Sequence, residues 1–233
     1  MRSLRESLLV GLILLGGAVQ VAHAQAEDIV ASGDVQLGVI LKDRPQLSAV
    51  LRGRDELRQW LIAELERKSP APLWDPAEPV SGRAAEHEYP SRGGAAPLGT
   101  AVIRVSSRAS GWDQLAGLVF ELHNVRRSGR FAEIYRAAVR GEIDKSEYVR
   151  SSLEEEFGAL RATRDFLEAN VGALPEAAEG SSALYRQVMQ TGDSFEEHLE
   201  RQAGHGEGLA AHFERLYEKE VVPERRRLDT GHP

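Results

Sequence analysis

The sequence predicts a mainly α-helical protein with a small β component. Three observations carry this prediction: apolar residues recur at spacings of three and four over long stretches, helix-start signals repeat, and one short run is rich in β-branched residues. Hydrophobic residues make up 42% of the 233-residue chain, which favours a folded core over a disordered chain. Residues 25–233 are predicted to form a single helical domain behind an N-terminal leader.

Residues 1–24 have the three-part pattern of an export signal. Two arginines give a positive start, an apolar run follows, and Ala22-His23-Ala24 supplies the small-x-small pattern that a signal peptidase reads. The run is shorter than the roughly 20 apolar residues of a membrane span, so a cleaved signal is favoured over an uncleaved anchor. We therefore expect a periplasmic or secreted protein that begins at Gln25 and has no stable membrane span.

Composition narrows the classes of partner. The formal net charge is −7, and a moderately acidic chain without a dense basic face is a poor nucleic-acid binder. The basic run Arg225-Arg226-Arg227 is typical of a solvated helix end. The chain has no cysteine, which excludes disulfides, thiolate zinc ligands and a lipid-anchor cysteine.

The first predicted helix covers residues 46–68, with Pro45 near its start and Gly53 as a point where it could break. The segment 69–99 follows and holds six of the chain's ten prolines, so no long helix can run there. We interpret it as a Pro/Gly-rich loop, either a flap over a cleft or a plain surface loop. It carries an unusual density of reactive side chains: Trp74, Glu86, His87, Glu88 and Tyr89.

The remaining elements follow from β-branched runs and capping signals. A strand is predicted over 100–106, and Ser110 to Asp113 resembles a capping box that opens the next helix. The later helices are predicted over 130–139, 144–170, 182–190 and 193–221, with Gly141 and Pro223 ending the first and the last.

The helix after the strand separates two faces. Its core face carries Leu115, Leu118, Val119, Leu122 and Val125. The opposite face carries the candidate binding residues Gly117, Phe120 and Asn124 together with Glu121, and Gln114 lies at its edge. His123 lies two residues from Glu121, so the two side chains diverge and cannot share a metal ion. A surface position or a satisfied hydrogen bond is the expected state of His123.

Glu156 interrupts the apolar seam of the helix over 144–170. The seam recurs at four and three residues through Val149, Leu153, Glu156, Leu160, Thr163 and Leu167. A carboxylate in such a seam needs a partner or a raised pKa, because burying a bare charge costs several kcal/mol. The alternative is that residues 154–156 form an exposed acidic patch paired with Arg150 and Arg161.

A strand, a helix with a central glutamate and a later helix with Glu-x-x-Ala together resemble the glutamate-type zincin metallopeptidases. In that family the strand borders the substrate cleft, and the first helix carries His-Glu-x-x-His, with two zinc ligands and a general base. By position, the resemblance implies that Glu121 matches the base and Glu156 the third ligand. Phe120 and Asn124 stand where the two histidines would be.

Without the two histidines, only one carboxylate and one amide remain as possible zinc ligands. Catalytic zinc needs about three protein ligands. We therefore expect no metal or other cofactor and a polar cluster of Glu121, Asn124 and Glu156. Three functions stay open. The first is a zincin-like protein that binds a peptide or protein partner or has a structural role. The second is a hydrolase that uses Glu121 and Glu156 without zinc or with a different metal. The third is an unrelated helical interaction module in which these glutamates are exposed.

Three further histidines recur at a spacing of seven in the last predicted helix: His198, His205 and His212. Neighbours seven residues apart are about 10 Å apart along a helix, too far for one metal ion. We interpret the spacing as coincidence or a solvated stripe.

Overall fold

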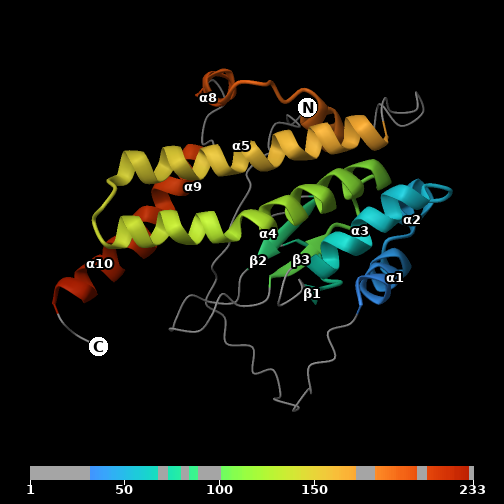
Figure 1. Ribbon diagram of the computed structural model, residues 1–233, viewed down its shortest axis with the longest axis horizontal. Helices are drawn as coiled ribbons and strands as arrows, with labels where there is room; N and C mark the ends of the chain where they lie inside the picture. The colour runs from blue at the N-terminus through green and yellow to red at the C-terminus, as the bar shows by residue number, and fades with distance from the viewer. Residues whose placement is uncertain are drawn as a thin grey trace, which may run out of the picture.

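The computed structural model describes residues 32–67, 73–79, 84–88, 101–171, 182–203 and 209–230. This part of the chain is mainly helical with one small sheet, which confirms the predicted fold class (Figure 1). Within these ranges, no helix has both the length and the apolar character needed to cross a membrane. The predicted signal, residues 1–24, lies outside the described residues.

Three short helices begin the described chain: α1 (Gly33–Asp43), α2 (Pro45–Val50) and α3 (Asp55–Arg67). The sequence did not predict α1. The helix predicted over 46–68 is broken at Gly53, whose φ of 72° is a left-handed value that costs glycine little. Pro45 occupies the first turn of α2, where its missing N–H leaves no bond unmade.

The sheet has the strand order β1-β3-β2, with β1 (Leu73–Trp74), β2 (Ala85–Glu88) and β3 (Val102–Val105). Strand β3 pairs in parallel with β1 and antiparallel with β2. The predicted strand 100–106 contains β3. Within the segment interpreted as a loop, residues 75–79 and 84 have no helix or strand, but residues 73–74 and 85–88 are strands, which the interpretation missed. Strands β1 and β2 have little β pattern of their own, and their pairing with β3 is what makes them strands.

Helix α4 (Gly111–Val139) is a single helix of 29 residues, so the separate helix predicted over 130–139 is wrong. Its N-cap is Ser110, whose Oγ accepts a hydrogen bond from Asp113 N at 3.1 Å. Helix α5 (Lys145–Asn170) begins with a complete capping box made by Asp144 and Glu147, as predicted. The two helices run antiparallel, and α4 lies between α5 and the sheet (Figure 1).

The C-terminal part consists of α7 (Ala183–Met189), α8 (Phe195–Ala203), α9 (Leu209–Leu216), a π-helical turn (Tyr217–Val221) and α10 (Val222–Asp229). The predicted end of the last helix before Pro223 is wrong. Pro223 lies in the first turn of α10, where a missing N–H is tolerated. The π-helical turn directly before it lets the chain continue as a helix past the proline.

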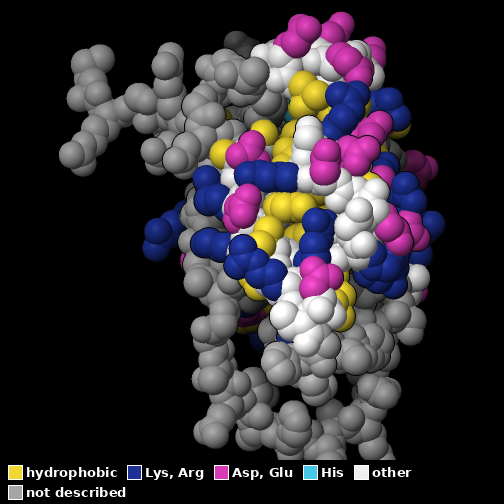
Figure 2. Space-filling model, turned by 90° about the vertical axis from the view of Figure 1, so that its left-hand side faces the viewer, with side chains coloured by type: hydrophobic (Ala, Val, Ile, Leu, Met, Phe, Trp, Pro, Cys, Tyr) yellow, Lys and Arg dark blue, Asp and Glu magenta, His cyan; other side chains and the backbone are white. Residues whose placement is uncertain are grey.

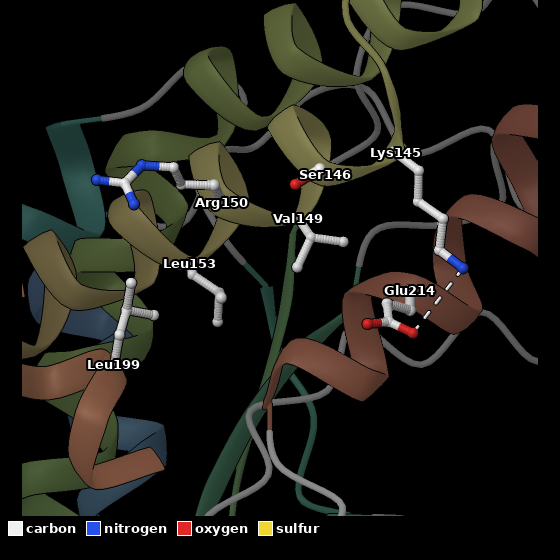
Figure 3. A pocket seen from close by; sticks show the side chains of 7 residues that line it. All are labelled: Lys145, Ser146, Val149, Arg150, Leu153, Leu199 and Glu214. Carbon is white, nitrogen blue, oxygen red and sulfur yellow. Dashed lines mark ion pairs between the residues drawn. The ribbon is translucent and has the colours of Figure 1, made fainter. Parts of the chain in front are cut away.

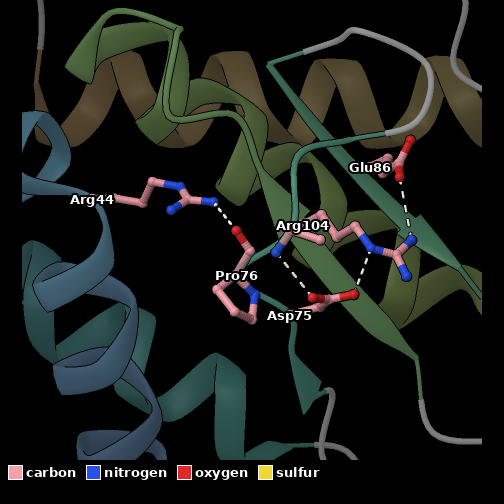
Figure 4. Close-up of polar contacts among 6 residues, drawn as sticks. Arg44, Asp75, Pro76, Glu86 and Arg104 are labelled. Carbon is pink, nitrogen blue, oxygen red and sulfur yellow. Dashed lines mark hydrogen bonds and ion pairs between the residues drawn. The ribbon is translucent and has the colours of Figure 1, made fainter.

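Two arginines fasten the sheet to its surroundings (Figure 4). Buried Arg44 donates from Nε to Val105 O at 2.6 Å and from a terminal nitrogen to Pro76 O at 2.8 Å. Arg104 of β3 donates to Asp75, just after β1, at 2.7 Å and to Glu86 of β2 at 3.3 Å. One guanidinium therefore links all three strands.

Gln114 is a fully buried hydrogen-bonding centre in the first turn of α4. Its Oε1 accepts from Leu47 N at 3.0 Å, and its Nε2 donates to Ser106 O at 2.9 Å and Ala109 O at 3.1 Å. This one side chain joins the start of α2 and the β3–α4 connection to α4.

Replacing Gln114 with leucine is expected to lower the free energy of unfolding by about 2–5 kcal/mol, because buried backbone groups of Leu47, Ser106 and Ala109 lose their partner. The same change at exposed Gln59 of α3 is the matched control and should alter stability by less than about 0.5 kcal/mol. Urea unfolding of both variants measures the difference. Equal effects would show that Gln114 does not have this role.

Candidate functional site

Strand β2 lies directly against the first half of α4. A Cβ placed on Gly117 would lie 2.8 Å from Ala85 Cβ and 3.3 Å from Ala85 N. Real Cβ atoms do not approach a neighbouring side chain this closely, so a side chain at Gly117 would push the strand away. Gly117, predicted as a binding residue, is thus the residue that allows β2 to touch the helix.

A second contact between the two elements follows one helical turn later. Four helical residues advance about 6 Å and two strand residues about 6.6 Å, so Glu121 and His87 come opposite each other as Gly117 and Ala85 do. His87 Nδ1 lies 2.5 Å from Glu121 Oε2, within hydrogen-bond distance. The exposed fractions are 6% for His87 and 3% for Glu121. Glu121, the predicted base, is therefore paired with a histidine inside the protein.

Two of the other predicted site residues, Asn124 of α4 and Glu156 of α5, meet where these helices pack together. Asn124 is fully buried, and its Nδ2 donates to Glu156 Oε2 at 3.3 Å. Of the three residues of the predicted polar cluster, Asn124 and Glu156 are joined by a hydrogen bond, and Glu121 contacts His87 of β2. Phe120 is also buried and belongs to the hydrophobic core.

The alternative of an exposed acidic patch over residues 154–156 is wrong for Glu156, which is only 5% exposed. Glu154 is exposed, as that alternative required. Glu155 pairs with Arg127 at 2.8 Å and with Arg130 at 3.6 Å, both on α4. Consecutive glutamates thus differ because the helix turns each one toward a different neighbour.

His123 was expected either at the surface or with satisfied hydrogen bonds, and the structure shows it buried with one ring nitrogen unpartnered among the described residues. It is 7% exposed, its ring centroid lies 5.7 Å from that of Trp60 in α3, and its Nε2 has no hydrogen-bond partner in the described structure. Burial, together with the nearby charges of Arg126 and Arg127, lowers the pKa of His123 to about 4. The imidazole is therefore neutral at pH 7.

The predicted histidine stripe does not lie on one helix. His198 belongs to α8 and is buried, with its ring centroid 5.1 Å from that of Phe157. His212 belongs to α9, and His205 lies outside the described residues. Among the residues that the structure describes, no three His, Cys, Asp or Glu side chains are grouped so that they could hold a metal ion.

A cavity of about 460 Å³ lies between α5, α8 and α9 (Figure 3). Val149, Leu153 and Leu199 form its apolar part. The polar lining residues are Lys145, Ser146, Arg150 and Glu214. Lys145 and Glu214 form an ion pair at 3.8 Å. The predicted site residues do not line this cavity.

On the face drawn in Figure 2, basic and acidic side chains alternate around hydrophobic ones.

The neutral, buried state of His123 predicts a pH-dependent stability. Its pKa is about 4 in the folded protein and about 6.5 in the unfolded chain, so the unfolded chain binds more protons between these values. The contribution of neutral His123 to the free energy of unfolding is fully present above pH 6.5 and is lost as the pH falls toward 4. The loss is on the order of 3 kcal/mol at most. Urea unfolding at pH 7.5 and 4.5 should show this loss in the wild type and a smaller one in His123→Phe. An unchanged pH dependence in the variant would exclude His123 as its source.

The chemistry of the site is that of two buried polar pairs on α4, whose members Glu121 and Asn124 lie three residues and about 60° apart around the helix. The His87–Glu121 pair joins an imidazole to a carboxylate and has the composition of an acid–base pair. The Asn124–Glu156 pair is an amide-to-carboxylate hydrogen bond between α4 and α5. None of the family models, curated proteins or solved structures compared with this chain matches it.

Proposed function

We propose that the protein is an exported, zincin-like protein without a catalytic zinc, and that it acts by binding a peptide or a segment of a protein partner beside β2 and α4. This proposal is supported mainly by the internal contacts of the two residues that occupy the positions of the zincin histidines. Phe120 packs in the hydrophobic core, and Asn124 donates its amide hydrogen to Glu156. Both side chains are engaged in internal contacts, which supports a scaffold adapted to a use other than zinc chemistry.

The position of β2 supports binding of an extended segment. In the described sheet β2 is an edge strand, with β3 as its neighbour on the inner side. Ser106 N donates to Ala84 O at 2.8 Å, so these two residues form a hydrogen-bonded pair between β3 and the start of β2. Hydrogen-bonded and non-hydrogen-bonded pairs alternate along an antiparallel ladder, so the backbone N–H and C=O of the next residue, Ala85, point away from β3. An added peptide strand pairs with groups of this orientation, a common mode of peptide recognition.

The strand is also held firmly enough to serve as a template. Arg104 bonds to Glu86 from one face of the sheet, while Gly117 and Glu121 receive Ala85 and His87 on the other. Consecutive residues of β2 are thus fixed on both faces of the sheet. A preformed strand spares the ordering cost that a flexible loop would incur on binding.

The test is fluorescence anisotropy with a fluorescein-labelled tryptic digest of casein as the peptide probe. The wild type should bind saturably, and bound peptide should slow amide hydrogen exchange over residues 84–88. Gly117→Ala, which displaces β2, should weaken binding at least about tenfold. Gly129→Ala is the matched control on the same helix, since a Cβ there has nothing within 4 Å.

Three outcomes would contradict the proposal. The first is the absence of saturable binding by the folded wild type. The second is protection from exchange around the α5–α8–α9 cavity instead of over residues 84–88. The third is equal binding by the Gly117→Ala and Gly129→Ala variants, both confirmed as folded by circular dichroism.

A second function, hydrolysis, is favoured by one observation, the 2.5 Å contact between His87 and Glu121. Histidine and carboxylate side chains are the usual general acids and bases, so this pair has the groups for proton transfer. Its partner assignment differs from the sequence-based hypothesis, which joined Glu121 with Glu156.

Release of fluorescent peptides from labelled casein in the presence of EDTA tests this second function. If the protein is a hydrolase of this kind, Glu121→Gln should lower the rate at least about 100-fold. Glu168→Gln, which removes the same charge from an exposed position on α5, should leave the rate unchanged. Either no hydrolysis by the wild type or full activity of Glu121→Gln would exclude it.

A further inference from the structure

Helix α1 has an exposed outer face opposite the side that packs on α3. We define the α1 outer face as Asp34, Val35, Gly38, Val39 and Lys42, all of which are exposed. Val35 is 55% exposed and Val39 45%, and they are two of the three large hydrophobic residues exposed in the described chain. A Cβ at Gly38 would have nothing within 4 Å, so the centre of the face is open to a close neighbour.

The two charged residues of this face are arranged symmetrically. Asp34 lies four residues before Gly38 and Lys42 four residues after it, so all three form one row along the helix. Neither charge has an ion-pair partner in the described structure. Val35 and Val39 form the adjacent row on the same side of the helix.

We propose that the α1 outer face is a docking surface for the same face of a second copy of this chain. In an antiparallel pair with its two-fold axis at Gly38, Asp34 of each copy lies opposite Lys42 of the other. The same rotation brings the two valine rows together beside these ion pairs. The face is therefore complementary to itself in both charge and apolar surface, which an isologous dimer requires.

The size of the face sets the strength of this association. An 11-residue helix is about 16 Å long, so the contact buries much less than the roughly 800 Å² per partner of a standard stable interface. We therefore expect a weak, concentration-dependent dimer with a Kd on the order of 10–100 μM.

Sedimentation equilibrium of the purified protein tests the proposal. Val39→Glu should abolish the dimer, whereas Leu228→Glu, at the third exposed hydrophobic residue, should not. Asp34→Lys alone and Lys42→Asp alone should each weaken dimerisation about tenfold, because each leaves two like-charge contacts in a symmetric dimer. The Asp34→Lys/Lys42→Asp double variant should recover the wild-type Kd.

Mixing the two single variants is the most discriminating part of the test. An equimolar mixture of Asp34→Lys and Lys42→Asp should form a heterodimer tighter than either variant alone, because every contact across the axis is then between opposite charges. A monomeric wild type at 500 μM, about fivefold above the upper end of the expected Kd range, would overturn the proposal. So would a mixture that associates no better than the separate variants, which would indicate that the face docks something other than a second copy.

Discussion

The close approach of β2 to α4 is the constraint on which the candidate site depends. Gly117 lacks the side chain that would push Ala85 away, and the matching advance of strand and helix then places His87 against Glu121. Arg104 secures the same strand from the other face through Glu86. The contact is therefore set by backbone geometry and sheet pairing as much as by attraction between the two side chains.

Helix α4 supports two different polar pairs because it lies between the sheet and α5. Glu121 faces the sheet and Asn124, three residues later, meets α5 through Glu156. Buried carboxylates are tolerated only with hydrogen-bond partners, and here each has one. The binding function that we propose uses the outer, strand side of this arrangement, and the internal pairs hold the helix and strand in place.

Local signals explain how much of the structure the sequence could predict. Capping signals and apolar spacing located the starts of α4 and α5, and a β-branched run located β3. The interruption of the α5 seam left two states open for Glu156, buried with a partner or exposed, and the buried state is the one observed. The partner of Glu121 could not be found this way, because His87 is 34 residues distant and its short strand has no pattern of its own. Burial of His123 was missed for the same reason, since it arises from packing against α3.

A double-mutant cycle between His87 and Glu121 tests the central claim most directly. The free energies of unfolding of the wild type, His87→Ala, Glu121→Ala and the double variant give the coupling energy between the two side chains. The account predicts a favourable coupling of at least about 1 kcal/mol, as expected for a buried hydrogen bond between an imidazole and a carboxyl group. A coupling of zero, with both single variants folded, would show that β2 does not bring His87 to Glu121.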